Sequence, residues 1–133
     1  MAGNPSTAAL KSAGNIKTFT YRVAADAATH TPMMFHSSQP FTVTRCTVLF
    51  DDAGNNPVGT LALNKVTAVS TVAIMAAATA WGATAAATPV NIPISSAANA
   101  VCAAADIITM TWTKTSGTIS VGTVVVEYFH HEA

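Results

Sequence analysis

The strongest constraint in this sequence is a two-residue alternation of apolar and polar side chains that recurs along the chain. In residues 107–114 large apolar side chains alternate with threonines, and residues 17–23 repeat the pattern with aromatic side chains. Successive side chains of a strand point to opposite faces, so such a segment is expected to be a strand with one buried face. The predicted strands cover residues 17–23, 32–35, 41–50, 58–66, 69–74, 90–94, 107–114 and 118–129.

Turn-forming residues separate these strands at intervals of about ten residues, a spacing typical of β-sandwiches. Residues 51–57, with the sequence DDAGNNP, form the densest turn signal. The sequence therefore predicts an all-β fold, a β-sandwich of jelly-roll type with about eight antiparallel strands. Residues 16–133 are expected to form this single domain, and residues 1–15, which show no strand or helix period, an extended N-terminal arm.

Local patterns add expectations for individual segments. A tight turn at 115–117 predicts that the last two strands pair as a β-hairpin. The final strand, 118–129, is apolar on both faces and should be central in its sheet or covered by a partner. Pro93 cannot donate a ladder hydrogen bond, so residues 90–94 are expected at a sheet edge. Residues 75–88 combine helix-favouring alanines with threonine and glycine, and are predicted to be a loop with one helical turn.

Charge is scarce, and this excludes several classes of partner. Only 9% of the 133 residues are charged, with six of each sign, against a usual fraction of about 25%. Zero net charge without a basic patch predicts no nucleic-acid partner. No charge occurs between Lys65 and Asp106, but Gly82, Pro89 and Pro93 interrupt this interval, so no membrane partner is expected. The low charge predicts instead that part of the surface is buried between subunits.

The chain carries few groups for catalysis or metal binding, and none of the common catalytic motifs. Asp51–Asp52 lack the spaced acids of a calcium loop, so they are interpreted as side chains that cap a turn. His130–Glu132 are interpreted as a frayed polar end, because neighbouring strand residues point to opposite faces. Cys46 and Cys102 are expected to be buried thiols. The sequence therefore predicts a protein that is not an enzyme and has no cofactor and no metal.

Interface candidates come from the Ala-rich stretch, from the last strand, which is apolar on both faces, and from the arm. Trp81 lies among alanine and glycine, which is compatible with two roles: a platform on which a sugar ring stacks, or a knob buried in a partner subunit. The knob is favoured, because tryptophan is enriched at the centres of interfaces. The candidate interface residues are Trp81, Met75, Val125, Phe129 and Leu10.

Four segments carry a resemblance to a known family. They are residues 18–24, residues 39–43, residues 58–66, and residues 105–110 taken with 123–128. Together they resemble the small jelly-roll structural proteins of tailed bacteriophages, capsid decoration (cement) proteins among them. The resemblance is one of pattern and covers most of residues 16–129. Ala105 stands where related patterns often place glycine before the Asp106 that opens the penultimate strand.

The resemblance implies a virion structural protein without enzymatic activity. Such decoration proteins commonly form trimers that bind major capsid protein subunits at three-fold positions of the capsid lattice. A homotrimer on the virion capsid surface, made in the host cytoplasm, is therefore expected. The alternative is a receptor- or glycan-binding head of a phage tail or neck fibre, which would use an exposed Trp81 or loop residues near Asp51 and Asn55.

Overall fold

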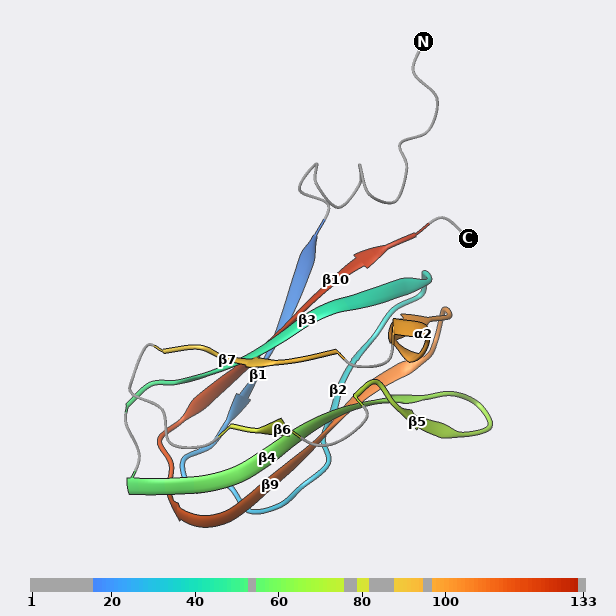
Figure 1. Ribbon diagram of the computed structural model, residues 1–133. Helices are drawn as coiled ribbons and strands as arrows, with labels where there is room; N and C mark the ends of the chain where they lie inside the picture. Colours follow the sequence, from blue (N-terminus) through green and yellow to red (C-terminus); the bar gives the residue numbers. More distant parts are fainter. Residues whose placement is uncertain (1–15, 53–54, 76–78, 82–87, 95–96, 132–133) are drawn as a thin grey trace.

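The computed structural model describes residues 16–52, 55–75, 79–81, 88–94 and 97–131. Two five-stranded antiparallel sheets lie face to face (Figure 1). The strands of sheet A are β1 (Lys17–Val23), β3 (Phe41–Phe50), β7 (Val90–Ile92), β8 (Val101–Cys102) and β10 (Gly122–His130). The strands of sheet B are β2 (Met33–His36), β4 (Asn55–Val66), β5 (Thr71–Ala73), β6 (Thr79–Ala80) and β9 (Ile107–Thr118).

The strand order is that of a jelly roll. Sheet A runs β1-β10-β3-β7, and sheet B runs β2-β9-β4-β5. The two-residue strands β6 and β8 lie beside these paths, β6 paired with β4 and β8 paired with β3. Eight principal strands thus form two four-stranded sheets, and the chain crosses repeatedly from one sheet to the other. The prediction of an all-β jelly-roll sandwich is confirmed.

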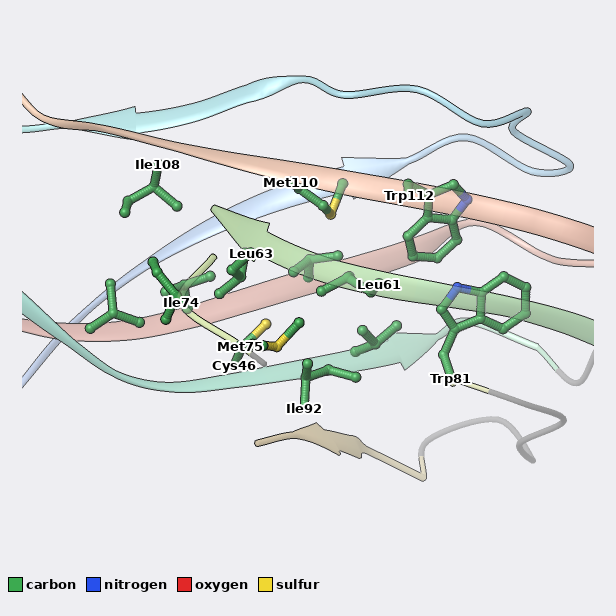
Figure 2. Packing of buried hydrophobic residues seen from close by; sticks show 14 of the residues in the cluster. Cys46, Leu61, Leu63, Ile74, Met75, Trp81, Ile92, Ile108, Met110 and Trp112 are labelled. Carbon is green, nitrogen blue, oxygen red and sulfur yellow. The ribbon is translucent and has the colours of Figure 1, made fainter. Parts of the chain in front are cut away.

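Most of the core consists of the inward positions of the alternating segments (Figure 2). In β9 the apolar residues Ile108, Met110 and Trp112 are fully buried, while the threonines between them are half-buried on the outer side. Aromatic rings fill both ends of β3. Phe41 contacts the rings of Phe35 and Tyr128 at one end, and Phe50 contacts two tryptophans at the other.

The predicted hairpin of the last two strands is wrong. β9 pairs with β2 and β4 in sheet B, whereas β10 lies between β1 and β3 in sheet A. The connection crosses the sandwich through Ile119, which is 4% exposed. Its carbonyl oxygen accepts from the Asp26 N–H at 3.2 Å, and its own N–H donates to Oδ1 of the Asp26 carboxylate at 2.9 Å. A strand-turn-strand pattern does not reveal whether the second strand joins the same sheet. The other expectation for this strand holds, because β10 is central in its sheet.

The remaining segments agree with the predictions in part. β7 lies at an edge of sheet A, which confirms the prediction made from the position of Pro93. Within residues 75–88, the structure shows the short strand β6 and no helical turn among the residues it describes there; residues 76–78 and 82–87 are outside them. A four-residue helix, α2, covers Ala97–Ala100 instead. The predicted arm, 1–15, also lies outside the described residues, and within those residues no helix is long and apolar enough to cross a bilayer.

Candidate interface surface

The outward side of sheet B forms a continuous surface of small polar and apolar side chains. Its centre consists of the outward positions of β4 and β9, which pair row by row across the two strands. We call this surface the uncharged face. Its residues are Thr60, Ala62, Asn64 and Val66 of β4 and Ile107, Thr109, Thr111 and Thr113 of β9, all half-buried.

No Asp, Glu, Lys or Arg projects from the uncharged face or from the outward positions of β2, β5 and β6 in the described part of the chain. The two lysines of β4 and β9 lie on the inward alternation, near the ends of the strands. The Nζ of Lys65 donates to the carbonyl oxygen of Val101 in sheet A at 2.8 Å. The Nζ of Lys114 lies 3.5 Å from Oδ1 of Asp26. Both ammonium groups are thus directed away from the uncharged face.

The outward side of sheet A differs in charge. Arg22, Arg45 and Glu127 occupy outward positions of β1, β3 and β10. The Arg22 guanidinium donates to both carboxylate oxygens of Asp51, at 2.9 and 3.3 Å, and to Oγ1 of Thr123 at 2.6 Å. This ion pair is about half exposed, so it adds little to stability. Sheet A therefore presents a charged, solvated outer surface.

Two of the predicted interface residues are in the core of this chain, so their prediction as interface residues is wrong. Trp81 is 1% exposed and Met75 is 2% exposed, and both lie among the buried side chains between the sheets (Figure 2). A side chain that its own subunit already covers cannot insert into a partner. The same burial removes Trp81 as the exposed sugar-stacking platform that the fibre-head alternative would use.

The physical reason for the burial of Trp81 is a glycine in the neighbouring strand. The Trp81 backbone N–H donates to the carbonyl oxygen of Gly59 at 3.2 Å, which continues the pairing of β6 with β4. The indole lies against Gly59, where a Cβ atom would overlap the ring. It stacks on Trp112 with ring centroids 5.1 Å apart and 17° between the ring planes. Neither the sequence around Trp81 nor that around Gly59 reveals this contact.

The other predicted interface residues have different positions. Val125 projects from the outer side of sheet A and is half-buried. Phe129 is on the same side of β10 but is only 4% exposed, and its ring lies 5.6 Å from that of His131. Leu10 lies outside the described residues. The structure does not bring Val125 and Phe129 onto the uncharged face.

An exposed apolar side chain lies at the turn between β4 and β5, at one end of sheet B. Val69 is 92% exposed. The turn is held by Thr67, whose Oγ1 accepts from the backbone N–H groups of Val69 and Ser70 at 3.3 and 3.1 Å. The Thr67 N–H donates to the Ser70 carbonyl oxygen at 2.8 Å. Val69 is therefore presented by a tightly bonded turn.

The groups considered for metal binding are engaged in structural contacts. Asp51 accepts from Arg22. The turn that its side chain is predicted to cap includes residues 53–54, which lie outside the described residues. His131 is held against β3 by a 2.7 Å bond between its Nε2 and Thr42 Oγ1, so the end is not frayed up to this residue. His130 contacts Tyr128 and His131 contacts Phe129, on opposite faces of the strand. In the described ranges, no three His, Cys, Asp or Glu side chains are grouped to hold a metal ion.

Both cysteines are free and buried, as the sequence predicted. Burial raises the pKa of the Cys46 thiol from its ordinary 9.0 to about 12. Burial also raises the pKa of Cys102 to about 11, with nearby Lys65 lowering it and Asp106 raising it to smaller extents. Thiols in such surroundings are unreactive near neutral pH, because the thiolate is the nucleophile.

Sequence reasoning missed the uncharged face as a surface. The signal was present in part, since the outward residues of 58–66 and of 107–114 are all uncharged. What the sequence did not supply was that these segments, which meet at Thr60 and Thr113, are neighbours in one sheet. The uncharged interval after Lys65 pointed instead to the stretch around Trp81, which the structure buries.

Comparison with known proteins adds little to this description. No protein-family model matches the sequence, and no curated protein matches it. The chain is similar to a chain in the structure of infectious bursal disease virus Gt strain, with a TM-score of 0.37 and 11% sequence identity. The match covers 89% of this chain and 38% of that chain, so this chain spans well under half the viral chain's length. A likeness at this score carries no argument about function, and the jelly-roll assignment is made from strand order.

Proposed function

We propose that this chain is a non-enzymatic virion structural protein, a decoration protein that binds the major capsid protein of a tailed phage as a homotrimer. The observation that carries the proposal is the uncharged face, a continuous outer surface of Thr, Ala, Asn, Val and Ile side chains. Burial of uncharged side chains avoids the cost of desolvating ions, so such a surface suits a permanent contact. The charged outer side of sheet A suits a surface that stays in solvent.

The fold supports the proposal in a second way. A jelly roll of eight principal strands is a sandwich with two broad outer faces. The outer side of sheet B suits contact with a neighbouring subunit, while the charged outer side of sheet A leaves the opposite side of the subunit hydrated. The resemblance of the strand segments to phage decoration proteins gives the particular class. The predicted arm, with Leu10, adds a further segment for contact with a capsid subunit.

The test is to locate the chain in purified particles of the virus that encodes it. Cryo-electron microscopy of intact particles is expected to show it on the outer capsid surface at three-fold positions, in a fixed ratio to the major capsid protein. Capsids made without the chain should break at lower temperature and should bind the purified protein when it is added back. Deletion of residues 1–15 is expected to weaken that binding.

Two outcomes would contradict the proposal. The chain could be absent from purified particles, which would remove any virion role. It could also occur at the tip of a tail or neck fibre, in which case the receptor- or glycan-binding alternative would be correct. A glycan-binding signal that does not depend on Trp81 would support the second outcome, because Trp81 is buried.

A further inference from the structure

The uncharged face restricts the kind of surface that can cover it. A charged group buried without an opposite charge or hydrogen-bond partners costs several kcal/mol. The uncharged face offers no Asp, Glu, Lys or Arg in the described part of the chain, so it cannot neutralise a charge on an occupant. Its occupant must therefore itself be free of charge over the area of contact. Such a surface is already present on the same face of another copy of the chain.

We propose that the uncharged face is a contact surface between copies of this chain. The inference rests on the self-association included in the proposed function and does not depend on the capsid partner. Around a three-fold axis, three copies of the face converge, so that uncharged surface meets uncharged surface. The charged outer side of sheet A then points away from the axis and remains free for solvent or for a different partner.

The chemistry of the face fits close packing against a neighbouring copy. Its centre consists of small or β-branched side chains, which stand upright on the sheet and have little side-chain entropy to lose when a neighbouring subunit covers them. The amide of Asn64 donates to Oγ1 of Thr111 at 3.1 Å, so this polar pair is satisfied within the face before any partner arrives. A satisfied pair can be buried at little cost.

The area of the uncharged face is compared with the area that one partner buries in a stable interface, because any shortfall must come from residues at the rim of the face. Each outward residue of a sheet covers about 30 Å². The eight central residues and their neighbours on β2, β5 and β6 thus provide about 400 Å², roughly half of what one partner contributes to a stable interface. Exposed apolar side chains at the rim supply further area. Met33 is 63% exposed and pairs with Thr109, and Val69 projects from the turn that follows β4.

The turn that carries Val69 favours a role in contact. Thr67 holds the turn through bonds from its own Oγ1 and backbone N–H. A side chain presented by a rigid turn loses little conformational entropy when it is buried by a partner. Val69→Ser is therefore expected to weaken association about tenfold without changing the thermal unfolding of the separated chain.

A pair of matched substitutions tests the proposal in the full chain. Thr109 and Thr47 are both half-buried, both outward, and both on strands with a neighbour on each side, but Thr109 is on sheet B and Thr47 on sheet A. Thr109→Lys places several like charges in the contact and is expected to raise the dissociation constant at least about 100-fold. Thr47→Lys should change it less than about threefold. Sedimentation equilibrium measures both, and circular dichroism shows whether each variant is folded.

Each result has a distinct meaning. If the wild-type chain is monomeric at micromolar concentration, or if Thr47→Lys dissociates it and Thr109→Lys does not, the inference is wrong. A third variant, Thr109→Val, keeps the shape without charge and should remain associated, which separates a charge effect from loss of the threonine. Capsid binding is measured separately: a monomeric wild type that still coats capsids would overturn this inference and leave the proposed capsid role intact.

Discussion

The outer sides of the two sheets are built on the same alternation but differ in charge. Sheet A carries Arg22, Arg45 and Glu127 on its outward positions, and the ion pair between Arg22 and Asp51 is about half exposed. The described outward positions of sheet B carry threonine, alanine, asparagine, valine and isoleucine at their centre. The 9% charge of the whole chain is thus unevenly distributed. Low overall charge therefore indicates a candidate contact surface only once the fold shows which outer side of the sandwich lacks charged residues.

The inner sides of the sheets contribute to stability, and the outer side of sheet B is assigned to association. Substitutions on the inner side of a sheet should lower the free energy of unfolding of the separate chain. Substitutions on the uncharged face should affect only the association of copies. The Thr109→Lys background, in which copies are expected to be separated, allows the two effects to be measured apart.

The largest expected effect is at Trp81, beneath sheet B. Trp81→Ala should lower the free energy of unfolding by about 4 kcal/mol, because it removes a fully buried ring that packs against Trp112 and Phe50. The loss should persist in the Thr109→Lys background, measured by urea denaturation. A loss that appears only in the assembled protein would place Trp81 in the interface after all.

Trp81→Phe is the matched control for this substitution. It keeps an aromatic ring between the sheets and sacrifices no hydrogen bond, because in the described part of the chain the Trp81 Nε1 has no partner. Its cost should therefore be clearly smaller, about 1 to 2 kcal/mol.

The next largest loss of stability is expected from an alanine substitution at a glycine, and each sheet provides one glycine for comparison. A Cβ at Gly59 of sheet B would overlap the Trp81 ring and the Thr113 carbonyl oxygen, and backbone cannot move aside cheaply. Gly59→Ala should cost about 3 kcal/mol. At Gly122 of sheet A a Cβ would lie 3.1 Å from the Phe50 ring, so Gly122→Ala should cost about 1 kcal/mol. Equal losses in thermal or urea unfolding would mean that Trp81 does not lie against Gly59.

The third effect is a pH dependence that originates beneath sheet A. Burial raises the pKa of Cys46 to about 12, against 9.0 for an accessible thiol. Between these values the unfolded chain releases a proton that the folded chain retains, so the free energy of unfolding falls as pH rises, by up to about 1.4 kcal/mol per unit. Urea denaturation from pH 8 to 10.5 should show a steeper decline in the wild type than in Cys46→Ala. Parallel curves would contradict the burial of this thiol.

The smallest effect is at the ion pair on the outer side of sheet A. Arg22 and Asp51 are 57% and 47% exposed in their side chains. Exposed pairs of this kind contribute at most about 1 kcal/mol, so Arg22→Ala should lower stability by less than that and should leave association unchanged. The difference from the wild type should shrink further in high salt. A variant that dissociates the assembly would show that sheet A, not sheet B, carries the contact.

The sequence was sufficient to predict the fold class, because alternation in β1, β4 and β9 specifies strands with one buried face. It was not sufficient for sheet membership: the segment 107–129 looks like a hairpin, yet the buried Ile119 carries the chain from sheet B to sheet A. The contact of Trp81 with Gly59 was equally hidden, since it depends on the pairing of β6 with β4. The uncharged face shares this limit, because Thr60 and Thr113 become neighbours only through strand pairing.

The residue before Asp106 has a backbone conformation that favours glycine. Ala105 has a φ of 70°, in the left-handed region where glycine is the least strained residue. Its N–H donates to the Ser37 carbonyl oxygen at 2.8 Å, and the Asp106 carboxylate closes the turn by accepting from the Ala103 N–H at 2.9 Å.

The most direct test of the account asks whether another copy covers the uncharged face. Cys46 and Cys102 are buried with raised pKa values, so a cysteine introduced at the surface is the only thiol expected to react near neutral pH. The labelling rate of Thr109→Cys by a thiol reagent should fall at least about tenfold as the protein concentration rises through the dissociation constant, whereas Thr47→Cys should label at one rate throughout. Equal and concentration-independent rates at both positions would contradict the claim that copies of this chain meet through sheet B.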